Sequence, residues 1–359
     1  MKSKVYFIKS SLEDGAALIS TKARKLFQAG QFASCFNTND FTAVKVHVGE
    51  AKNTTYIKAP CLKGLVDELK TLNVKPFLTD TSTLYTGRRH NAVDHATLAA
   101  EHGFDVHGLG IPFIAPDGLF GNTETPISIN GEIHKNVLIA SDIAMCQSLL
   151  SIAHLTGHCA TCAAATLKTL GMGCASRKGK MRQHSALKPS ISDKCTNCGT
   201  CVARCSENAI TIDNAKAKID QSKCVGCAEC FAVCRFDAVQ YDWGAQNEKL
   251  QKSIAEHALG AIKGKESHSV FFNFGLSITR DCDCFSQKDM PLIVNDIGIF
   301  ASTDPVAVDA AAIETVHKQS KKTFSQLLDN QNLDHRQQLI HAEKIGLGRM
   351  DYDLIEIIL

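Results

Sequence analysis

Two runs of four cysteines constrain this chain more than any other feature of its sequence. Each run has the spacing C-x2-C-x2-C-x3-C; the first is Cys195, Cys198, Cys201 and Cys205, and the second is Cys224, Cys227, Cys230 and Cys234. Three thiolates at this spacing hold three corners of a cubane, and the fourth cysteine of each run reaches the other cluster. The pattern predicts two [4Fe–4S] clusters, one held by Cys195, Cys198, Cys201 and Cys234 and the other by Cys224, Cys227, Cys230 and Cys205.

Zinc is the main alternative to iron–sulfur clusters for these cysteines. Zinc sites combine two C-x2-C pairs about 15–20 residues apart, whereas here each run has four cysteines. Ser206 and Arg235 stand where proline usually follows the last cysteine, but that position is not a ligand. Neighbouring cubanes carry electrons from one to the next, which favours electron transfer over a purely structural role.

Length and composition narrow the class of protein. The chain has 359 residues, a net charge of +2 and 16 cysteines. This charge gives no indication of nucleic-acid binding, and no apolar stretch of about 18 residues indicates a membrane span. Without a signal peptide at the start, we expect a cytoplasmic protein. In a reducing compartment so many cysteines indicate metal rather than disulfides, and they suit an anaerobe.

Outside the cysteine runs, strand and helix patterns alternate. This alternation predicts an α/β body with a mostly parallel sheet. Asn130-Gly131 predicts a hairpin. We expect strands at 5–8, 41–48, 76–81, 147–155, 269–278 and the final YDLIEIIL, and helices that begin at Ser11, Pro60, Ala92, Asp304 and Asp334.

The cysteine runs interrupt this body. Residues 178–192 are basic and polar, which predicts a linker, and strand and helix patterns return after Trp243. The simplest organisation is a discontinuous body of residues 1–185 and 243–359. Residues 186–242 then form an inserted α+β module like a bacterial ferredoxin with two [4Fe–4S] clusters.

Polar side chains near predicted strand ends are candidates for a site in the body. Ligands of open α/β sheets bind at the carboxyl ends of the strands. A buried parallel strand rarely carries Lys and His without a partner or a function, although an edge strand with one wet face would explain them. The candidates are Lys45 and His47 in VKVHV, Asp80 in TDT, and Asp281, Cys282, Asp283 and Cys284 in DCDC.

A second group of thiols lies between two predicted strands of the body. Cys159 and Cys162 form a C-x2-C pair beside His158, and Cys174 follows twelve residues later. Together with Cys282 and Cys284 they are candidate ligands of a third metal, a disulfide switch, or simply packed side chains. The basic loop with Arg88 and Arg89 either holds an anion or is only solvated.

These segments together resemble the DUF362 family of iron–sulfur proteins. The resemblance rests on VKVHVGE, LTDTSTLYTGRRHNAVDHA, LTGH, LKTLGMGCASRKGK, DCDC and DIGIFASTDPVAVDAA, with the cysteine runs between them. It implies an α/β body with an inserted ferredoxin module. Thr169 stands where related sequences usually have Asn, and the stretch from His158 to Cys162 is usually richer in glycine. The resemblance favours one site made by Lys45, His47, Asp80, Lys168, His184, Asp281 and Asp283.

Three functions fit these features. The leading hypothesis is a redox enzyme whose clusters pass electrons to a small anionic substrate in the body. The second is an electron carrier or partner subunit that docks with a reductase, dehydrogenase or ferredoxin and has no catalysis of its own. The third is a non-redox enzyme with structural or sensing clusters. None of the three requires nucleic acid or a membrane.

Overall fold

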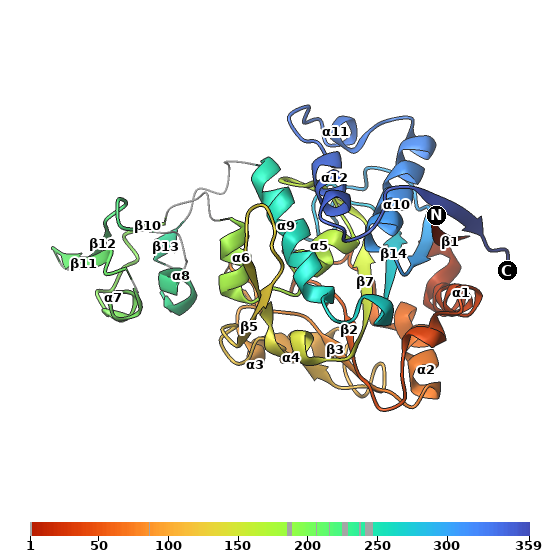
Figure 1. Ribbon diagram of the computed structural model, residues 1–359, viewed down its shortest axis with the longest axis horizontal. Coiled ribbons are helices and arrows are strands. Elements are labelled where there is room, and N and C mark those ends of the chain that lie inside the picture. The colour runs from red at the N-terminus through yellow and green to blue at the C-terminus, as the bar shows by residue number, and fades with distance from the viewer. Residues whose placement is uncertain are drawn as a thin grey trace.

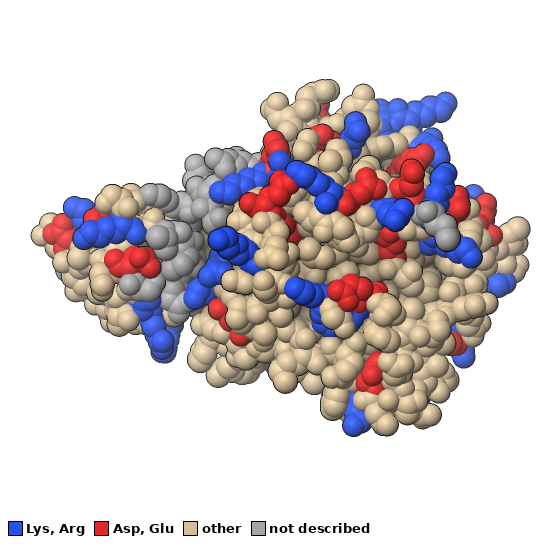
Figure 2. All heavy atoms as spheres, in the orientation of Figure 1, with Lys and Arg blue, Asp and Glu red and all other residues tan. Residues whose placement is uncertain are grey.

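The computed structural model describes residues 2–85, 87–184, 189–205, 207–214, 216–224, 229–236, 238–240 and 247–359. Of the predicted cluster ligands, Cys227 lies outside these ranges. No helix in the described part of the chain is long and apolar enough to cross a membrane. On the face drawn in Figure 2, basic and acidic side chains are interspersed, and neither sign forms a continuous patch.

An eight-stranded sheet with the order β16-β1-β15-β14-β7-β2-β3-β4 forms the centre of the body (Figure 1). The five strands from β14 to β4 run parallel, β15 is antiparallel to both its neighbours, and β1 pairs in parallel with β16. This confirms the predicted α/β body with a mostly parallel sheet. The strands are β1 (Ser3–Lys9), β2 (Phe41–Lys45), β3 (Lys75–Thr79), β4 (Phe113–Ile114), β7 (Ser148–His154), β14 (Ser269–Gly275), β15 (Gly298–Ser302) and β16 (Tyr352–Glu356).

The central strands are apolar because both of their faces are covered. Every residue of β14, SVFFNFG, is buried, and so is every residue of β7 except the last. Alternate side chains of these strands enter two hydrophobic clusters, one on each face of the sheet. Each cluster is closed by its own set of helices.

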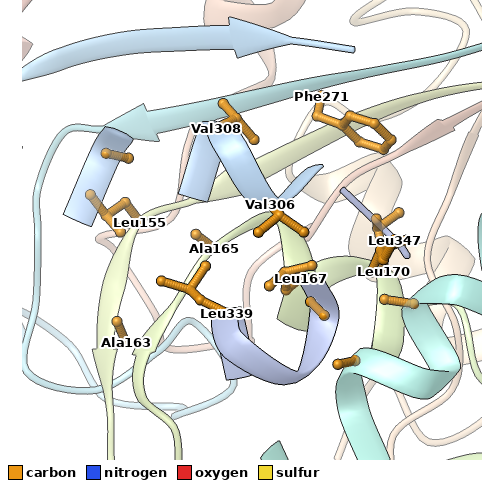
Figure 3. Close-up of a cluster of buried hydrophobic side chains, with 14 of the residues drawn as sticks. Leu155, Ala163, Ala165, Leu167, Leu170, Phe271, Val306, Val308, Leu339 and Leu347 are labelled. Atoms are coloured by element: carbon orange, nitrogen blue, oxygen red, sulfur yellow. The ribbon is translucent and has the colours of Figure 1, made fainter. Parts of the chain in front are cut away.

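One face is covered by α1 (Gly15–Ala29), α2 (Lys63–Thr71) and α3 (Ala92–Glu101). The other is covered by α5 (Thr166–Gly171), α9 (Asn247–Ile262), α10 (Pro305–Ser320) and α12 (Arg336–Lys344). Figure 3 shows how Leu167 and Leu170 of α5 lie among Val306, Leu339 and Leu347. This packing fixes α5, which is short, against the sheet.

Local signals place several of these elements. Ser11 and Asp14 form the expected capping box before α1, and Asp304 accepts hydrogen bonds from the amides of Val306 and Ala307 at the start of α10. The other elements of the body are η1 (Leu12–Asp14), η2 (Phe32–Cys35), η3 (Ala59–Leu62), η4 (Glu266–His268), α4 (Ser141–Met145), α6 (Arg177–Gln183), α11 (Phe324–Leu327), β5 (Glu124–Ser128), β6 (Asn136–Ala140), β8 (Thr156–His158) and β9 (Cys162–Ala164).

The structure differs from the sequence-based expectations in three places. The predicted linker at 178–192 begins with helix α6, because Ser176 caps it by accepting from the amide of Gly179. The hairpin at Asn130 is real, but residues 129–135 connect β5 and β6, so the turn is longer than two residues. The strand predicted at 41–48 ends at Lys45.

The described residues between Pro189 and Gln240, here called the cysteine segment, lie to one side of the sheet (Figure 1). Its elements are β10 (Ser190–Ile191), α7 (Thr200–Arg204), β11 (Ile210–Asp213), β12 (Lys216–Ile219), α8 (Glu229–Val233) and β13 (Val239–Gln240). β10 pairs with β13 and β11 with β12, both antiparallel. Strand β7 precedes the cysteine segment in the sequence and pairs with β14, which follows it. The sheet is therefore built from residues on both sides of the segment in the sequence.

A small hydrophobic cluster joins the cysteine segment to the body. Cys230 and Phe231 of α8 pack in the same cluster as Leu84 and Met181 of the body. The guanidinium carbon of Arg177 lies 5.8 Å from the centre of the Phe231 ring. Helix α6 therefore forms the surface of the body against which the segment rests.

Candidate functional site

The parallel strands bring polar side chains to one edge of the sheet. His47 follows β2, Asp80 follows β3, His154 ends β7, and the DCDC stretch follows β14. These four strands are neighbours in the sheet and point in the same direction. Their carboxyl ends therefore meet at the edge where α/β proteins bind ligands.

A lysine and two thiols form the centre of this edge. The ammonium of Lys168, on α5, lies 3.0 Å from the sulfur of Cys282 and 4.0 Å from that of Cys284. Nε2 of His47 lies 3.5 Å from the Cys284 sulfur. The amide of Phe285 donates to the carbonyl of Cys282 at 3.0 Å. The chain therefore turns here, and the turn directs both sulfurs toward Lys168.

The charges of this group stabilise one another. A hydrogen bond from the Cys284 thiol, together with the charge of Lys168, lowers the pKa of Cys282 to about 6 against the opposing effect of burial. The same hydrogen bond raises the pKa of Cys284. Burial disfavours the Lys168 ammonium, but the nearby sulfurs outweigh burial and raise its pKa. At neutral pH the group therefore holds one ammonium, one thiolate and one thiol.

Two neutral histidines flank the thiols. Nδ1 of His158 accepts from the amides of Ala160 and Thr161 at 3.0 and 3.1 Å, so the neutral ring carries its proton on Nε2. Burial, with the charge of Lys168, lowers the pKa of His158 to about 3. Burial lowers the pKa of His184 to about 4, with help from His158 and Lys168. Both rings are uncharged at pH 7 and polar.

His154 and Asp283 make a buried ion pair beneath the thiols. Nδ1 of His154 lies 2.8 Å from Oδ2 of Asp283, and Nε2 lies 2.6 Å from the carbonyl of Leu276. Both ring nitrogens face acceptors, so both must donate and the imidazolium is favoured. Burial opposes this charge, but Asp283 raises the pKa of His154. Burial alone would raise the pKa of Asp283, yet His154 lowers it to about 2.

Lys45 and Asp80 belong to a separate buried network beside this group. The ammonium of Lys45 lies 2.9 Å from Oδ1 of Asp80, and Arg89 lies 2.9 Å from Oδ2. Arg89 also contacts Glu50 at 2.7 Å, and Tyr85 donates to the same carboxylate. Lys45 and Arg89 are each paired with a carboxylate inside the protein. We therefore assign this network a structural role beneath the site and not the binding of an anion.

The structure brings together most, but not all, of the residues that the sequence singled out. His47, Lys168, His184, Cys282, Asp283 and Cys284 lie in one region, and Cys159 and Asp281 lie close enough to it to interact electrostatically. Cys162 and Cys174 lie elsewhere. Cys162 has a φ of 67° and is directed into the core near His335, and Cys174 is buried beside Lys45 and Cys146.

The five candidate thiols of the body, which are Cys159, Cys162, Cys174, Cys282 and Cys284, thus do not meet at one point. Within the described ranges, no group of three or more His, Cys, Asp or Glu side chains is arranged to hold a metal ion. The idea of a third metal centre built from all five cysteines is therefore not supported by their positions. Lys168 occupies the place beside the two DCDC sulfurs that a cation would take.

Two participants could not be recognised in the sequence. His154 ends an apolar strand and lies 129 positions before its partner Asp283. Lys180 of α6 is buried and donates to the Thr81 hydroxyl and the Ser82 carbonyl, and burial lowers its pKa to about 8. A histidine at the end of a buried strand was the only local signal for the first, and there was none for the second.

The cysteine segment contains a cavity lined by four cysteines from both runs. They are Cys195, Cys198, Cys201 and Cys234. The sulfurs of Cys195, Cys205 and Cys234 accept backbone N–H hydrogen bonds at 3.3–3.4 Å, from Ala217, Ala209 and Ala238. Each of these three sulfurs has its own amide donor, and the four cysteines that line the cavity are those that the spacing assigned to the first cluster.

The fold and the site define an α/β protein with a lysine–thiol site at the carboxyl edge of its parallel strands. Residues 42–314 match the DUF362 family, which is described as a domain of unknown function, and the chain belongs to that family. Among solved structures, the lactate racemase apoprotein from Thermoanaerobacterium thermosaccharolyticum is similar at 10% identity and a TM-score of 0.44. The match covers 89% of this chain and 58% of that one. No curated protein matches the chain.

Proposed function

We propose that this protein is an iron–sulfur redox enzyme in which residues 186–242 form a ferredoxin-type module and the lysine–thiol site binds a small anionic substrate. When bound, the two [4Fe–4S] clusters supply one-electron transfer. The observation that carries the proposal is the convergence of Cys195, Cys198, Cys201 and Cys234 on one cavity. The first three come from one run and Cys234 from the other, as a two-cluster module requires.

The amides that contact the cysteine sulfurs support this assignment. Hydrogen bonds to sulfur are one of the means by which a protein sets the reduction potential of a cluster. The amides of Ala217, Ala209 and Ala238 each donate to a cysteine sulfur. Cys205, together with Cys224, Cys227 and Cys230, would hold the second cluster.

The position of the cysteine segment supports a connection with the body. Cys230, a proposed ligand of the second cluster, packs against Leu84 and Met181. Met181 lies on α6 next to Lys180, and Lys180 contacts the loop that follows β3. One short helix thus contacts the segment on one side and the edge of the sheet on the other.

The lysine–thiol site has the groups that an anion requires. Lys168 keeps its positive charge, and Nε2 of His158 carries a hydrogen that it can donate to a ligand. The neutral histidines and the Cys284 thiol are groups that can give or accept protons during a reduction. When Cys282 is protonated or oxidised, no thiolate balances Lys168, and the attraction of this ammonium inside a buried site then favours a small anion over a neutral molecule.

The first test is the metal and acid-labile sulfide content of protein purified without oxygen. About eight iron and eight sulfide per chain are expected from two cubanes. Cys198→Ser, in the cavity, should lower both, whereas Cys61→Ser, in the core of the body, should leave both unchanged. Zinc in place of iron, or no metal, would refute the module.

A second measurement distinguishes a redox enzyme from an electron carrier that has no catalysis of its own. Dithionite-reduced protein is mixed with the small-molecule fraction of a cell extract, and reoxidation of the clusters is followed by absorbance. A redox enzyme should lose this reoxidation in Lys168→Met while keeping its iron. Equal rates for the wild type and Lys168→Met would support the carrier instead.

A further inference from the structure

We propose that Cys282 and Cys284 form a two-electron dithiol–disulfide couple at the lysine–thiol site. The sulfurs of Cys282 and Cys284 lie 3.0 and 4.0 Å from the same Lys168 ammonium, so the two thiols are directed to one point of the site. The turn closed by the Phe285 amide and the Cys282 carbonyl holds them together. For the acceptor of the electrons, this inference rests on the proposed function.

The neighbours of the two sulfurs give them different roles. Lys168 lies 3.0 Å from the Cys282 sulfur and favours its thiolate, which is the form that attacks in thiol–disulfide exchange. Nδ1 of His47 accepts from the amide of Gly49 at 3.1 Å, so the neutral ring has its hydrogen on Nε2, facing the Cys284 sulfur. Cys282 is buried and Cys284 is partly exposed, which makes Cys284 the sulfur that a substrate meets.

Oxidation of this pair balances with the two clusters of the proposed function as the electron acceptor. One Cys282 thiolate and one Cys284 thiol form an S–S bond and release two electrons and one proton. The proton passes to solvent beside the partly exposed Cys284. The acceptors would be the two [4Fe–4S] clusters that the cysteine segment would hold, each of which can take one electron. The reverse reaction would reduce the disulfide with two electrons from the clusters.

A metal site formed by Cys282 and Cys284 fits the structure less well than a dithiol–disulfide couple. The Lys168 ammonium contacts both sulfurs, at 3.0 and 4.0 Å, and already balances the thiolate charge. Cys162 and Cys174, which would have to complete a thiolate site, are directed elsewhere. The exposed Cys159 is the remaining thiol near the pair, and it is a competitor in any test.

The test is a redox titration of the full chain in dithiothreitol buffers without oxygen, with acid quenching, alkylation and peptide mass spectrometry. Cys282 and Cys284 should become protected together, in one peptide that is lighter by two hydrogens. Lys168→Met should shift the exchange equilibrium about tenfold toward the disulfide, or about 30 mV, because the thiolate loses its cation. Lys168→Arg should restore it, and Cys159→Ser should leave the couple unchanged.

Three results would overturn the couple: reduced Cys282 and Cys284 across the whole titration, a disulfide from Cys282 to Cys159, or a stoichiometric zinc held by the pair. The proposed function is tested independently of the couple, because it fails only if iron and sulfide are absent.

Photochemical reduction of the clusters then tests whether electrons pass between the clusters and the Cys282–Cys284 couple. If clusters are present, the Cys282–Cys284 disulfide should open in the wild type, and a disulfide that stays closed would refute the electron exchange.

Discussion

Replacement of Asp283 by asparagine should destabilise the body by about 3 kcal/mol. Asp283 and His154 are 2.8 Å apart and their side chains are each 4% exposed. Lowering the pKa of Asp283 from 3.8 to about 2 corresponds to about 2.4 kcal/mol in favour of the folded, charged carboxylate. Removing one partner of a buried pair costs roughly 3–5 kcal/mol, so the two estimates agree in order of magnitude.

The pH dependence of this loss has a defined sign. Since the pKa of Asp283 is lowered by folding, its contribution is present above pH 3.8 and is lost as the pH falls through about 2. The pKa of His154 is raised by folding, so its contribution is present below the unfolded value and is lost as the pH rises through the raised value. The difference between wild type and Asp283→Asn should therefore decline at alkaline pH.

Urea unfolding followed by far-UV circular dichroism, at a series of pH values, measures this difference. Asp281→Asn is the matched control, two positions away in the same turn. The Asp281 carboxylate makes no hydrogen bond or ion pair with the described residues that would be lost, and its replacement should change stability by less than about 0.5 kcal/mol. Equal losses in the two variants, or a loss for Asp283→Asn that does not vary with pH, would show that the ion pair is not what stabilises the turn.

Three further predictions follow from contacts described above. Lys45→Met should cost about 3–5 kcal/mol in thermal unfolding, because Asp80 loses a buried partner, whereas Lys63→Met on the surface should cost less than about 1 kcal/mol. Gly157→Ala should destabilise the body by about 1–3 kcal/mol, since its Cβ would lie 2.3 Å from the Arg280 carbonyl oxygen; an unchanged melting temperature would contradict this. Phe231→Ala should make the cysteine segment more sensitive to limited proteolysis while the body stays resistant, because Phe231 packs on Leu84 and Met181.

The strands of the sheet were predictable because burial on both faces leaves a direct mark in the sequence. The run SVFFNFG of β14 is apolar throughout and is buried throughout. Caps such as Asp304 before Pro305 are equally local, since the side chain bonds to amides two and three positions later. Signals of this kind depend only on neighbouring residues, so they survive in a single sequence.

Helix α6 and the composition of the site could not be predicted, because both depend on contacts between residues that are distant in the sequence. The seven residues RKGKMRQ are mostly basic and polar, and they read as a linker because Lys180 is buried only through Thr81 and Ser82, about a hundred positions earlier. The two thiols of the C-x2-C pair, Cys159 and Cys162, do not face the same site, and the reason is local. The left-handed backbone at Cys162 sends its side chain into the core while Cys159 stays exposed.

The order of strands in the sheet has a consequence for how this protein is made. Residues of β2, β3, β4 and β7 lie between 41 and 154, so these strands can pair while the rest of the chain is still being synthesised. β1 is made first, yet its partners are β15 and β16, close to the other end of the chain. Contacts of such sequence separation form slowly and leave apolar edges exposed in the meantime. The DCDC thiols follow β14, so Lys168 and His47 are synthesised well before the sulfurs that they contact, and the site cannot be complete until β14 has joined β7.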